Sequence, residues 1–493
     1  MIEVKEFLKK KFKTEVIENK TKQGEWLTWY KNNNAWRTYK VMLPNKKRTK
    51  KDVTRSTLNS CKRVCEDWAN LLLNEKTDIV VNMLAKQIET KVDTNTTEED
   101  TNKVKADTYN DLLHDVLVKN DFWTFGNKAI EKVFALGGGA FVVGKNDDDE
   151  INIEFVDATR CYVMKCNADE VIDCAFENTI TLRGKKHTIL NVHIQNEQKT
   201  YTIYNYLFDD DGNALSENEM KELLNVEAEV VSNTKTFSFI TPQNLSAENW
   251  DTPFADSVYA KAIDANKMID LAFDSYCNEY ILGKKRIFVA SELMTFERET
   301  TANGKTVAVP VFDENEVVFN ILPENSNDET IIKEVNMDLR TEAHQTGIQD
   351  ALNFFASLCG LGEKYYKYEQ GNITTATQVV SENSTLFRNI QKQQIPIERC
   401  LKEICFAIFG LLEIDTSLIE DIVITFDDSI IQDKEAERKQ DMSDVNNGIM
   451  SKAEYRAKWY GETLEVAQKT IDAIEGKEIE NEMKRQQTQG ILI

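Results

Sequence analysis

The sequence has 493 residues, of which 41% are hydrophobic, enough to bury a substantial core and to exclude an intrinsically disordered chain. Its 83 acidic residues outnumber its 60 basic ones, which gives a net charge of −23. A chain this acidic repels phosphate backbones, so its composition argues against a high-affinity reader of nucleic acid.

Two helical patterns occur between residues 51 and 120, where apolar residues recur at helical spacing around Trp68 and again around Val116. The polar stretch 93–102 between them is predicted to be an exposed loop. The run LGGGAFVVG at 136–144 indicates the end of a helix followed by a strand. It lacks the Lys followed by Ser or Thr that a phosphate-binding loop requires.

Residues 140–240 alternate with period two, as in INIEFV and YTIYNYLF, which predicts a mainly antiparallel β region with DDDG at 209–212 as a hairpin turn. A long amphipathic helix follows, with Thr252 as its cap, Pro253 at its first position and Gly283 at its end. After a β-type excursion containing RIFVA, VAVPVF and EVVFNILP, a second helix is predicted from near Asp338 to Gly360.

A third helical pattern begins at Thr375, which forms a capping-box pattern with Gln378, and continues to about Leu412. Pro396 lies inside it and should kink the helix, because its ring removes one backbone donor. DIVITFDDSI then reads as a strand, and the chain ends in a polar, helix-rich tail. The predicted fold class is mixed α/β, of the α+β type.

No motif gives positive support for catalysis or for a metal. Leu207 occupies the first ligand position before DDDG, so calcium is not expected there. The cysteines at 61 and 65 and at 161, 166 and 174 lack the C-x₂-C spacing of zinc sites, which favours buried thiols. A Ser/His/Asp triad is defined by geometry that a sequence does not reveal, but no nucleophile-elbow motif is present.

The location of the protein is also open to inference. Nine cysteines form an odd set, and Met1 opens directly into a charged, polar stretch, so we expect reduced thiols and a cytosolic origin. No apolar run approaches the roughly 20 residues that a membrane-spanning helix needs, so no membrane segment is expected.

Four local strings, in this order, resemble the portal proteins of siphoviruses that infect Gram-positive bacteria. They are VCEDWANLLLNE (64–75), TPFADSVYAKAIDANKMIDLAFDSYCNE (252–279), TTATQVVSENSTLFRNI (374–390) and GIMSKAEYRAKWYGETLEVAQ (448–468). None is a catalytic signature, and residues 1–49 lie outside the resemblance.

The resemblance implies a ring subunit, usually one of twelve, with a wing, a two-helix stem, a clip, a long kinked helix and a helical crown. Residues 1–253 would form the wing. The remaining parts would be the stem helices at 254–282 and 338–357, the clip at 283–333, the tunnel loop at 358–374, the long kinked helix and a wing strand at 375–429, and the crown and C-terminal tail at 430–493.

The resemblance also implies site residues. The DNA-facing tunnel loop would contain Glu363, Lys364, Tyr365, Tyr366, Lys367, Tyr368 and Glu369. Lys364 and Lys367 are expected to touch phosphate, whereas the tyrosines either face DNA or pack within the protein. The stem helices are expected to pack through Ile269, Tyr276, Leu352 and Phe355, within or between subunits.

Two basic clusters stand out against the acidic background. Near the start of the chain are Lys46, Lys47, Arg48, Lys50 and Lys51, for which a solvated surface run is the favoured interpretation. At the end of the first stem helix are Lys284, Lys285 and Arg286. For these a complement to the helix dipole is as good an explanation as contact with DNA or with a packaging motor.

The expected function is that of a portal protein, a non-enzymatic ring without cofactors that forms the DNA channel at the unique capsid vertex. Its expected partners are further copies of itself, the terminase large subunit during packaging, the head-tail connector or adaptor protein afterwards, the major capsid and scaffolding proteins, and double-stranded DNA without sequence preference. It would occur in the host cytoplasm during assembly and then in the virion. Two alternatives stay open, a cytosolic acidic metal-dependent enzyme and another virion structural component such as a connector or baseplate protein.

Overall fold

The computed structural model divides into two compact units. The first comprises Met1–Glu369 and Asn389–Thr425, and the second Gln370–Arg388 and Phe426–Ile493. The described residues are 4–42, 50–74, 77–83, 98–146, 150–167, 170–247, 250–283, 286–290, 296–300, 306–310, 319–322, 332–335, 337–367, 376–426, 434–460, 464 and 466–474.

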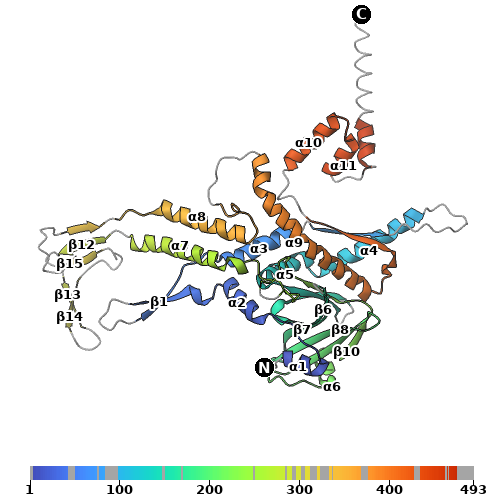
Figure 1. The fold of residues 1–493 in the computed structure, drawn as a ribbon, viewed down its shortest axis with the longest axis horizontal. Helices are drawn as coiled ribbons and strands as arrows, with labels where there is room; N and C mark the ends of the chain where they lie inside the picture. The colour runs from blue at the N-terminus through green and yellow to red at the C-terminus, as the bar shows by residue number, and fades with distance from the viewer. Residues whose placement is uncertain are drawn as a thin grey trace, which may run out of the picture. The chain divides into compact units, whose positions relative to one another are not determined.

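The larger sheet of the first unit has the strand order β10-β9-β8-β7-β6, and all its neighbours are antiparallel (Figure 1). Its strands are β6 (Cys161–Asn167), β7 (Glu170–Leu182), β8 (Lys185–Gln195), β9 (Tyr201–Phe208) and β10 (Glu229–Ser232). Helix α1 (Val4–Phe12) packs on one face through Leu8, against Leu190 and Phe208 among others. The predicted turn after β9 is present, with Gly212 N donating to Asp209 O, and α6 (Glu217–Leu224) precedes β10.

A second sheet has the order β11-β4-β5, formed by β4 (Gly139–Lys145), β5 (Ile151–Asp157) and β11 (Phe237–Ile240). Helix α5 (Phe122–Leu136) ends at Gly137, whose φ of 74° and close approach to the Ala255 carbonyl both require glycine. The predicted helix end followed by a strand is therefore confirmed. Helix α3 (Ser60–Leu72) lies against α5, where the rings of Trp68 and Phe134 stack with centroids 5.5 Å apart.

The prediction that residues 51–120 are helical outside one loop is wrong in two places. Strand β2 (Lys50–Thr54) pairs with β1 (Thr38–Met42), and β3 (Asp78–Met83) pairs with β17 (Ile419–Thr425). Both strands are fixed by partners outside the predicted helical stretch, and for β3 the partner lies more than 300 residues away. Helices α3 and α4 (Glu98–Lys119) account for the helical patterns around Trp68 and Val116. The predicted exposed loop at 93–102 is wrong for residues 98–102, which begin α4, and residues 93–97 lie outside the described residues.

The first long helix begins later than predicted. A short 3₁₀ turn, η3 (Ala260–Ala262), leads into α7 (Ile263–Leu282), so the predicted start at residues 252–254 is wrong. Upstream of η3, Ala255 N donates to Gly137 O and Val258 N donates to Phe134 O. These bonds to the α5–β4 corner replace the helical ones, and Thr252 instead accepts from Phe254 N.

The second helix agrees with its prediction, since α8 spans Thr341–Leu358 and packs along α7 (Figure 1). The predicted β excursion between the two helices is present as β12 (Arg286–Ala290), β13 (Phe296–Thr300), β14 (Thr306–Pro310), β15 (Phe319–Leu322) and β16 (Ile332–Val335). They form a three-stranded sheet of order β15-β12-β16 and a β13–β14 hairpin.

The third helix is confirmed as α9 (Ala376–Leu411), a 36-residue helix with Pro396 inside it, and β17 matches the predicted strand. In the second unit, α10 (Lys434–Asn446) packs with α11 (Lys452–Tyr460) through Asp441. This carboxylate accepts from Trp459 Nε1 at 2.9 Å and pairs with Lys458 Nζ at 2.7 Å. The helix-rich tail is confirmed for these residues.

The remaining elements of the first unit are α2 (Lys20–Tyr30), η1 (Ala35–Arg37), η2 (Ala158–Arg160) and η5 (Thr416–Leu418).

Candidate functional site

The segment after α8 is held by two distant helices. Trp68 Nε1 donates to Cys359 O at 3.1 Å, and Asn389 Nδ2 donates to Gly360 O at 2.8 Å. Gly360 and Gly362 have φ values of 85° and 93°, which glycine adopts without strain, and Leu361 between them is buried. The start of the predicted tunnel loop is thus fixed to the body of the first unit.

Tyr366 is engaged by the fold. Its hydroxyl donates to Asp67 Oδ2 at 2.7 Å, and Arg63 Nε lies 3.1 Å from the other oxygen of that carboxylate. Burial, reinforced by Asp67, raises the pKa of Tyr366 well above its usual value. Gln349 Nε2 also donates to Tyr366 O at 2.7 Å. Of the two interpretations for the tyrosines, packing describes Tyr366.

The neighbouring side chains are exposed, namely those of Glu363, Lys364, Tyr365 and Lys367. The Tyr365 ring stands at 89° to that of Tyr366 with centroids 5.0 Å apart, and burial of its inner part raises the pKa of Tyr365 to about 12. Tyr368 and Glu369 lie outside the described residues. Contact of this segment with DNA stays a prediction.

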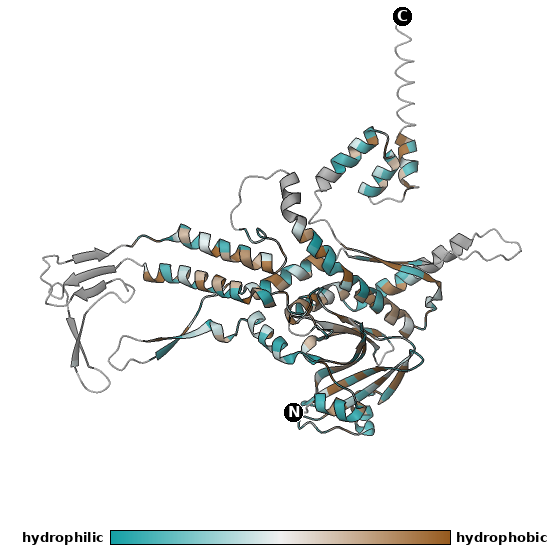
Figure 2. Cartoon of the chain, viewed as in Figure 1, coloured by the Kyte–Doolittle hydropathy of each residue, from teal (hydrophilic) through white to brown (hydrophobic). Residues whose placement is uncertain are grey.

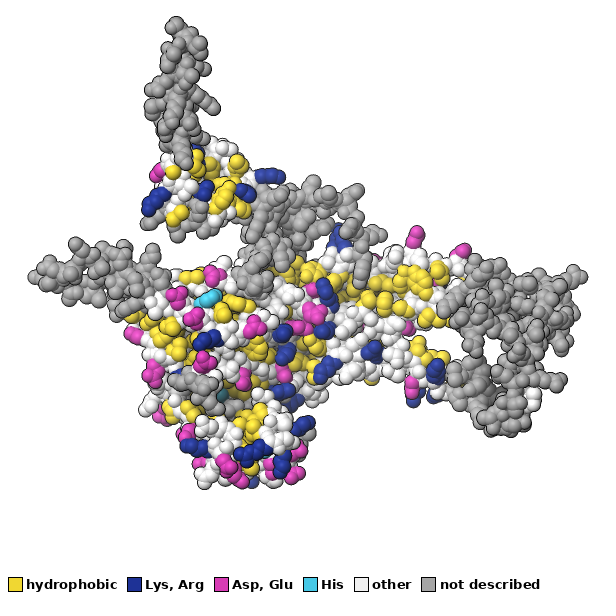
Figure 3. Space-filling model, turned by 180° about the vertical axis from the view of Figure 1, so that it is seen from behind, with side chains coloured by type: hydrophobic (Ala, Val, Ile, Leu, Met, Phe, Trp, Pro, Cys, Tyr) yellow, Lys and Arg dark blue, Asp and Glu magenta, His cyan; other side chains and the backbone are white. Residues whose placement is uncertain are grey.

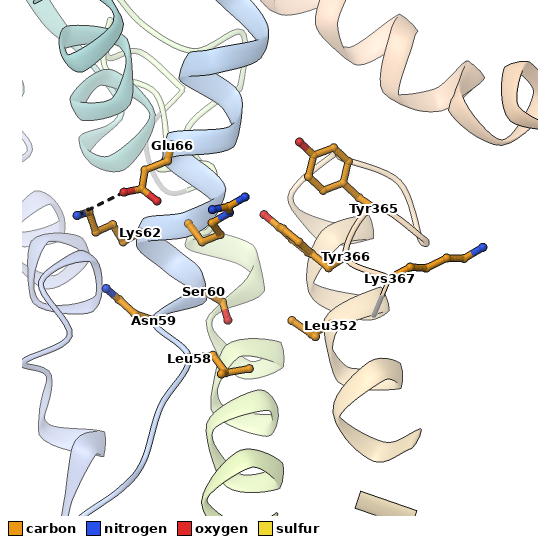
Figure 4. Close-up of a pocket in the computed structure, with 10 residues that line it drawn as sticks. Leu58, Asn59, Ser60, Lys62, Glu66, Leu352, Tyr365, Tyr366 and Lys367 are labelled. Carbon is orange, nitrogen blue, oxygen red and sulfur yellow. Dashed lines mark ion pairs between the residues drawn. The ribbon is translucent and has the colours of Figure 1, made fainter. Parts of the chain in front are cut away.

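A cavity of about 500 Å³ lies between the start of α3, α8 and this segment (Figure 4). It is lined by Leu58, Asn59, Ser60, Lys62, Arg63, Glu66, Leu352, Tyr365, Tyr366 and Lys367. Its lining contains basic and aromatic side chains, which are the kinds that line surfaces binding nucleic acid. The sequence does not reveal this cavity, because the part of its lining from Leu58 to Glu66 is nearly 300 residues away from Leu352 and Tyr365–Lys367 in the chain.

The predicted stem residues are packed inside one chain. Ile269 on α7 and Leu352 and Phe355 on α8 are buried. Tyr276 is half-buried, and its ring lies against that of His344 on α8, with centroids 5.7 Å apart. These residues therefore join the two helices to each other and to the body, which fits the within-subunit alternative.

A second set of apolar residues on the same helices faces outward. Met268 and Leu271 on α7 are 46% and 51% exposed, and Phe354 and Leu358 on α8 are 60% and 40% exposed. On each helix the two positions are three or four residues apart, so they share a face. Apolar residues follow both helices in Figure 2 and reach their surface in Figure 3. Sequence reasoning missed this set because it followed only the stripe that forms the core. We call these four residues the stem stripe.

A polar clamp joins the ends of α7 and α8 that adjoin the β excursion. Arg340 donates to both carboxylate oxygens of Glu279, at 3.0 and 2.8 Å, and His344 Nε2 lies 3.5 Å from one of them. The hydrogen bonds from Arg340 lower the pKa of Glu279 to about 2. A Cβ on Gly283 would lie 2.6 Å from the backbone oxygen of Glu279 and 2.4 Å from Leu339 Cδ2, so any larger residue would force this joint to shift.

The remaining predicted site residues are the basic cluster after α7 and the proline inside α9. Lys284 and Lys285 lie outside the described residues, and Arg286 begins β12, where its backbone pairs with Val335. In α9, Pro396 leaves the carbonyl four residues earlier without its usual donor. A kink there stays a prediction.

All nine cysteines have free thiols. Cys65 Sγ donates to Cys61 O at 3.3 Å, and burial raises the pKa of both thiols, which keeps them protonated. In the part of the chain that the structure describes, no group of three or more His, Cys, Asp or Glu side chains could hold a metal ion. Within the same residues, no helix combines the length and the hydropathy needed to cross a membrane.

Residues 9–485 match the family model described as phage portal protein, SPP1 Gp6-like. Two solved structures are similar in fold. The neck of an empty GTA particle computed with C6 symmetry has a chain that is 12% identical, with 80% of this chain and 87% of that chain covered and a TM-score of 0.38. The neck of a native GTA particle computed with C12 symmetry has one that is 11% identical, with 90% and 94% covered and a TM-score of 0.41. No curated protein matches the sequence.

The family match spans almost the whole chain, and the fold it accompanies is a mixed one with long helices around a β excursion. The protein belongs to the phage portal protein family of the SPP1 Gp6 type. Its role is therefore that of a portal subunit, part of the ring through which phage DNA passes at the capsid vertex. The family is structural and not enzymatic.

Proposed function

We propose that twelve copies of the chain form a closed ring in which α7 and α8 of each copy lie against the next. In the host cytoplasm the ring docks the terminase large subunit for packaging, within a shell of major capsid and scaffolding proteins, and afterwards it holds the head-tail connector. The wing, stem, clip, tunnel loop and crown follow the residue ranges expected from the family, except that the first stem helix is α7, which begins at Ile263. Strands β12 to β16 would form the clip that faces the docking partners.

The stem stripe carries the ring proposal. Ile269, Leu352 and Phe355 already fill the core between α7 and α8. Packing within one chain therefore does not need the residues of the stem stripe. Exposed apolar side chains aligned on a helix pair cost free energy in water, and a neighbouring copy would cover them. A repeated contact between different faces of identical copies closes into a ring when the rotation between them divides a full turn.

The proposal is tested with Phe354→Glu, because this side chain is 60% exposed and its loss should leave the fold intact. We expect monomers or open fragments in native mass spectrometry and negative-stain images, with an unchanged circular dichroism spectrum that shows an intact subunit fold. Phe406→Glu is the matched control, since Phe406 is 41% exposed on α9 and lies outside the stripe. Closed rings of parental mass from Phe354→Glu would contradict the proposal.

We also propose that Lys364 and Lys367 touch the DNA in the channel. Both are exposed on the segment that follows α8, whereas Tyr366 beside them is held by Asp67. Contacts to phosphate suit a moving duplex, because base-edge contacts would favour particular sequences and slow its passage. The net charge of −23 on each copy keeps the overall attraction weak.

A further inference from the structure

The β1–β2 hairpin projects from the first unit without a sheet to join (Figure 1). Its two strands pair in register from Thr38 opposite Thr54 to Met42 opposite Lys50. In the part of the chain that the structure describes, neither strand has a strand neighbour on its outer edge. A lone two-stranded hairpin is only marginally stable in water, so this one gains by binding something.

The base of the hairpin is nevertheless fixed. The Arg55 guanidinium lies 4.0 Å from the centroid of the Trp36 ring and 4.4 Å from that of Tyr39. Ser56 N donates to Asp274 Oδ1 on α7 at 2.9 Å, directly after the hairpin. The hairpin is therefore a projection held at a defined place on the body.

Its surface combines positive charge with apolar side chains. Residues 37–55 contain eight basic residues and one acidic residue, within a chain whose net charge is −23. Lys40, Lys50 and Lys51 are exposed on the strands. Val41 and Met42 are also exposed, at 39% and 55%.

We infer that this hairpin binds the outer face of α7 and α8 in the next copy of the chain, and is the element that covers the stem stripe there. The inference rests on the proposed ring. The stripe offers apolar surface for Met42, which lies on the same face of the hairpin as Lys40 and Lys50. Acidic residues lie beside it. Asp350 is exposed four residues before Phe354, and Asp264, four residues before Met268, is exposed and pairs with Lys267 at 2.9 Å. Residues four apart share a helix face, so each carboxylate adjoins an apolar member of the stripe.

DNA is the less favourable occupant. Phosphates would pair with Lys40 and Lys50, but Met42 on the same face would remain in water. A DNA backbone offers little apolar surface beyond its deoxyribose C–H groups, whereas a second copy supplies both carboxylates and apolar side chains. Charge complementarity between a basic hairpin and an acidic subunit adds orientation to the contact.

Cross-linking tests the inference directly. A photo-cross-linking amino acid replaces Met42, and rings are assembled from equal amounts of ¹⁴N- and ¹⁵N-labelled chains. After illumination in the presence of duplex DNA, we expect peptides that join a light chain to a heavy chain, with the second site in residues 263–282 or 341–358. The same amino acid at Val231, which is exposed on the edge strand β10, is the control and should give no such peptides.

The outcomes separate the two proposals because native mass spectrometry reports ring formation in the same samples. Intact rings with cross-links only inside one chain, or only to DNA, would overturn the hairpin contact and leave the ring proposal standing. Absence of rings in the unmodified parent would overturn both. The triple variant Lys40→Glu, Lys50→Glu and Lys51→Glu should lose closed rings, and Asp264→Lys with Asp350→Lys should restore them. Lys185→Glu with Lys186→Glu, an exposed pair on β8, should have no effect.

Discussion

Asp270 on α7 is a buried carboxyl group with incomplete hydrogen bonding. Its Oδ2 accepts from Asn266 Nδ2 at 3.3 Å, whereas Oδ1 has no partner among the described residues. Burial raises the pKa of Asp270 to about 7, against the opposing effect of Arg55 and Arg37. In the unfolded chain the same group ionises near pH 3.9. Between these two values the folded state holds a proton that the unfolded state has lost.

This difference predicts how stability depends on pH. A group whose pKa is raised on folding contributes stability below its unfolded pKa, and that contribution is lost as the pH rises through the folded value. The parent should therefore lose about 1.4 kcal/mol of unfolding free energy per pH unit from pH 5 to pH 7 relative to Asp270→Asn. Urea unfolding of both proteins at pH 5, 6, 7 and 8 measures this difference in unfolding free energy. If it did not change with pH, the raised pKa of Asp270 would be wrong.

Lys364 and Lys367 provide a second test at single residues. If both lysines contact phosphate as proposed, replacing them by alanine should weaken DNA binding by rings and make it depend less steeply on salt. The length of packaged DNA or its retention should change, while ring assembly stays normal, because exposed loop residues contribute little to the fold. Tyr366→Phe is the control, because it removes the hydrogen bond that holds this segment to Asp67 and leaves both lysines in place. Full-length, stably retained genomes in the double mutant would remove these lysines from the mechanism.

Helix α8 carries two adjacent phenylalanines with different proposed roles, one in packing within the chain and one in assembly of the ring. Phe355 is fully buried and Phe354 is 60% exposed. We expect Phe355→Ala to lower the free energy of unfolding by about 3 to 5 kcal/mol, as truncation of a buried Phe does. Phe354→Ala should change it by less than about 0.5 kcal/mol. Thermal and denaturant unfolding of the two variants gives the comparison, and equal effects would show that α8 is wrongly oriented.

The sequence was informative wherever structure depends on local periodicity. Alternation predicted β5 and β9, and helical spacing predicted α8 and the extent of α9. It failed where distant segments decide the outcome. Residues 252–259 look like a helix start, but their amides bond to Gly137 and Phe134, more than 100 residues earlier.

The same reason limits what could be predicted of the site. Tyr365 and Tyr366 are adjacent and chemically alike, yet only Tyr366 finds Asp67, on a helix nearly 300 residues away. The stem stripe was present in the sequence as apolar residues outside the core pattern. The basic run near residue 50 was interpreted as a solvated surface, because a strand pairing with Thr38–Met42 was not foreseen.

On the scale of the whole molecule, the two units should have separable roles. All four residues of the stem stripe lie in the first unit, whereas residues 448–493 belong to the second. A chain that ends at Asn447 should therefore still form rings, while packaging is impaired. Native mass spectrometry and packaged-genome length measure the two effects. A purely monomeric truncated chain would place a principal interface in the tail.

The clamp at the ends of α7 and α8 has a consequence for how such proteins diversify. Glu279 with Arg340, and Gly283 against Leu339, bring the two ends of the intervening stretch together on the body side. Any segment inserted between these two ends would therefore be attached to the body at the same two contacts. If this stretch docks the partners as proposed, a chimaera spliced at Gly283 and Leu339 should keep the body of this chain and bind the partners of its donor.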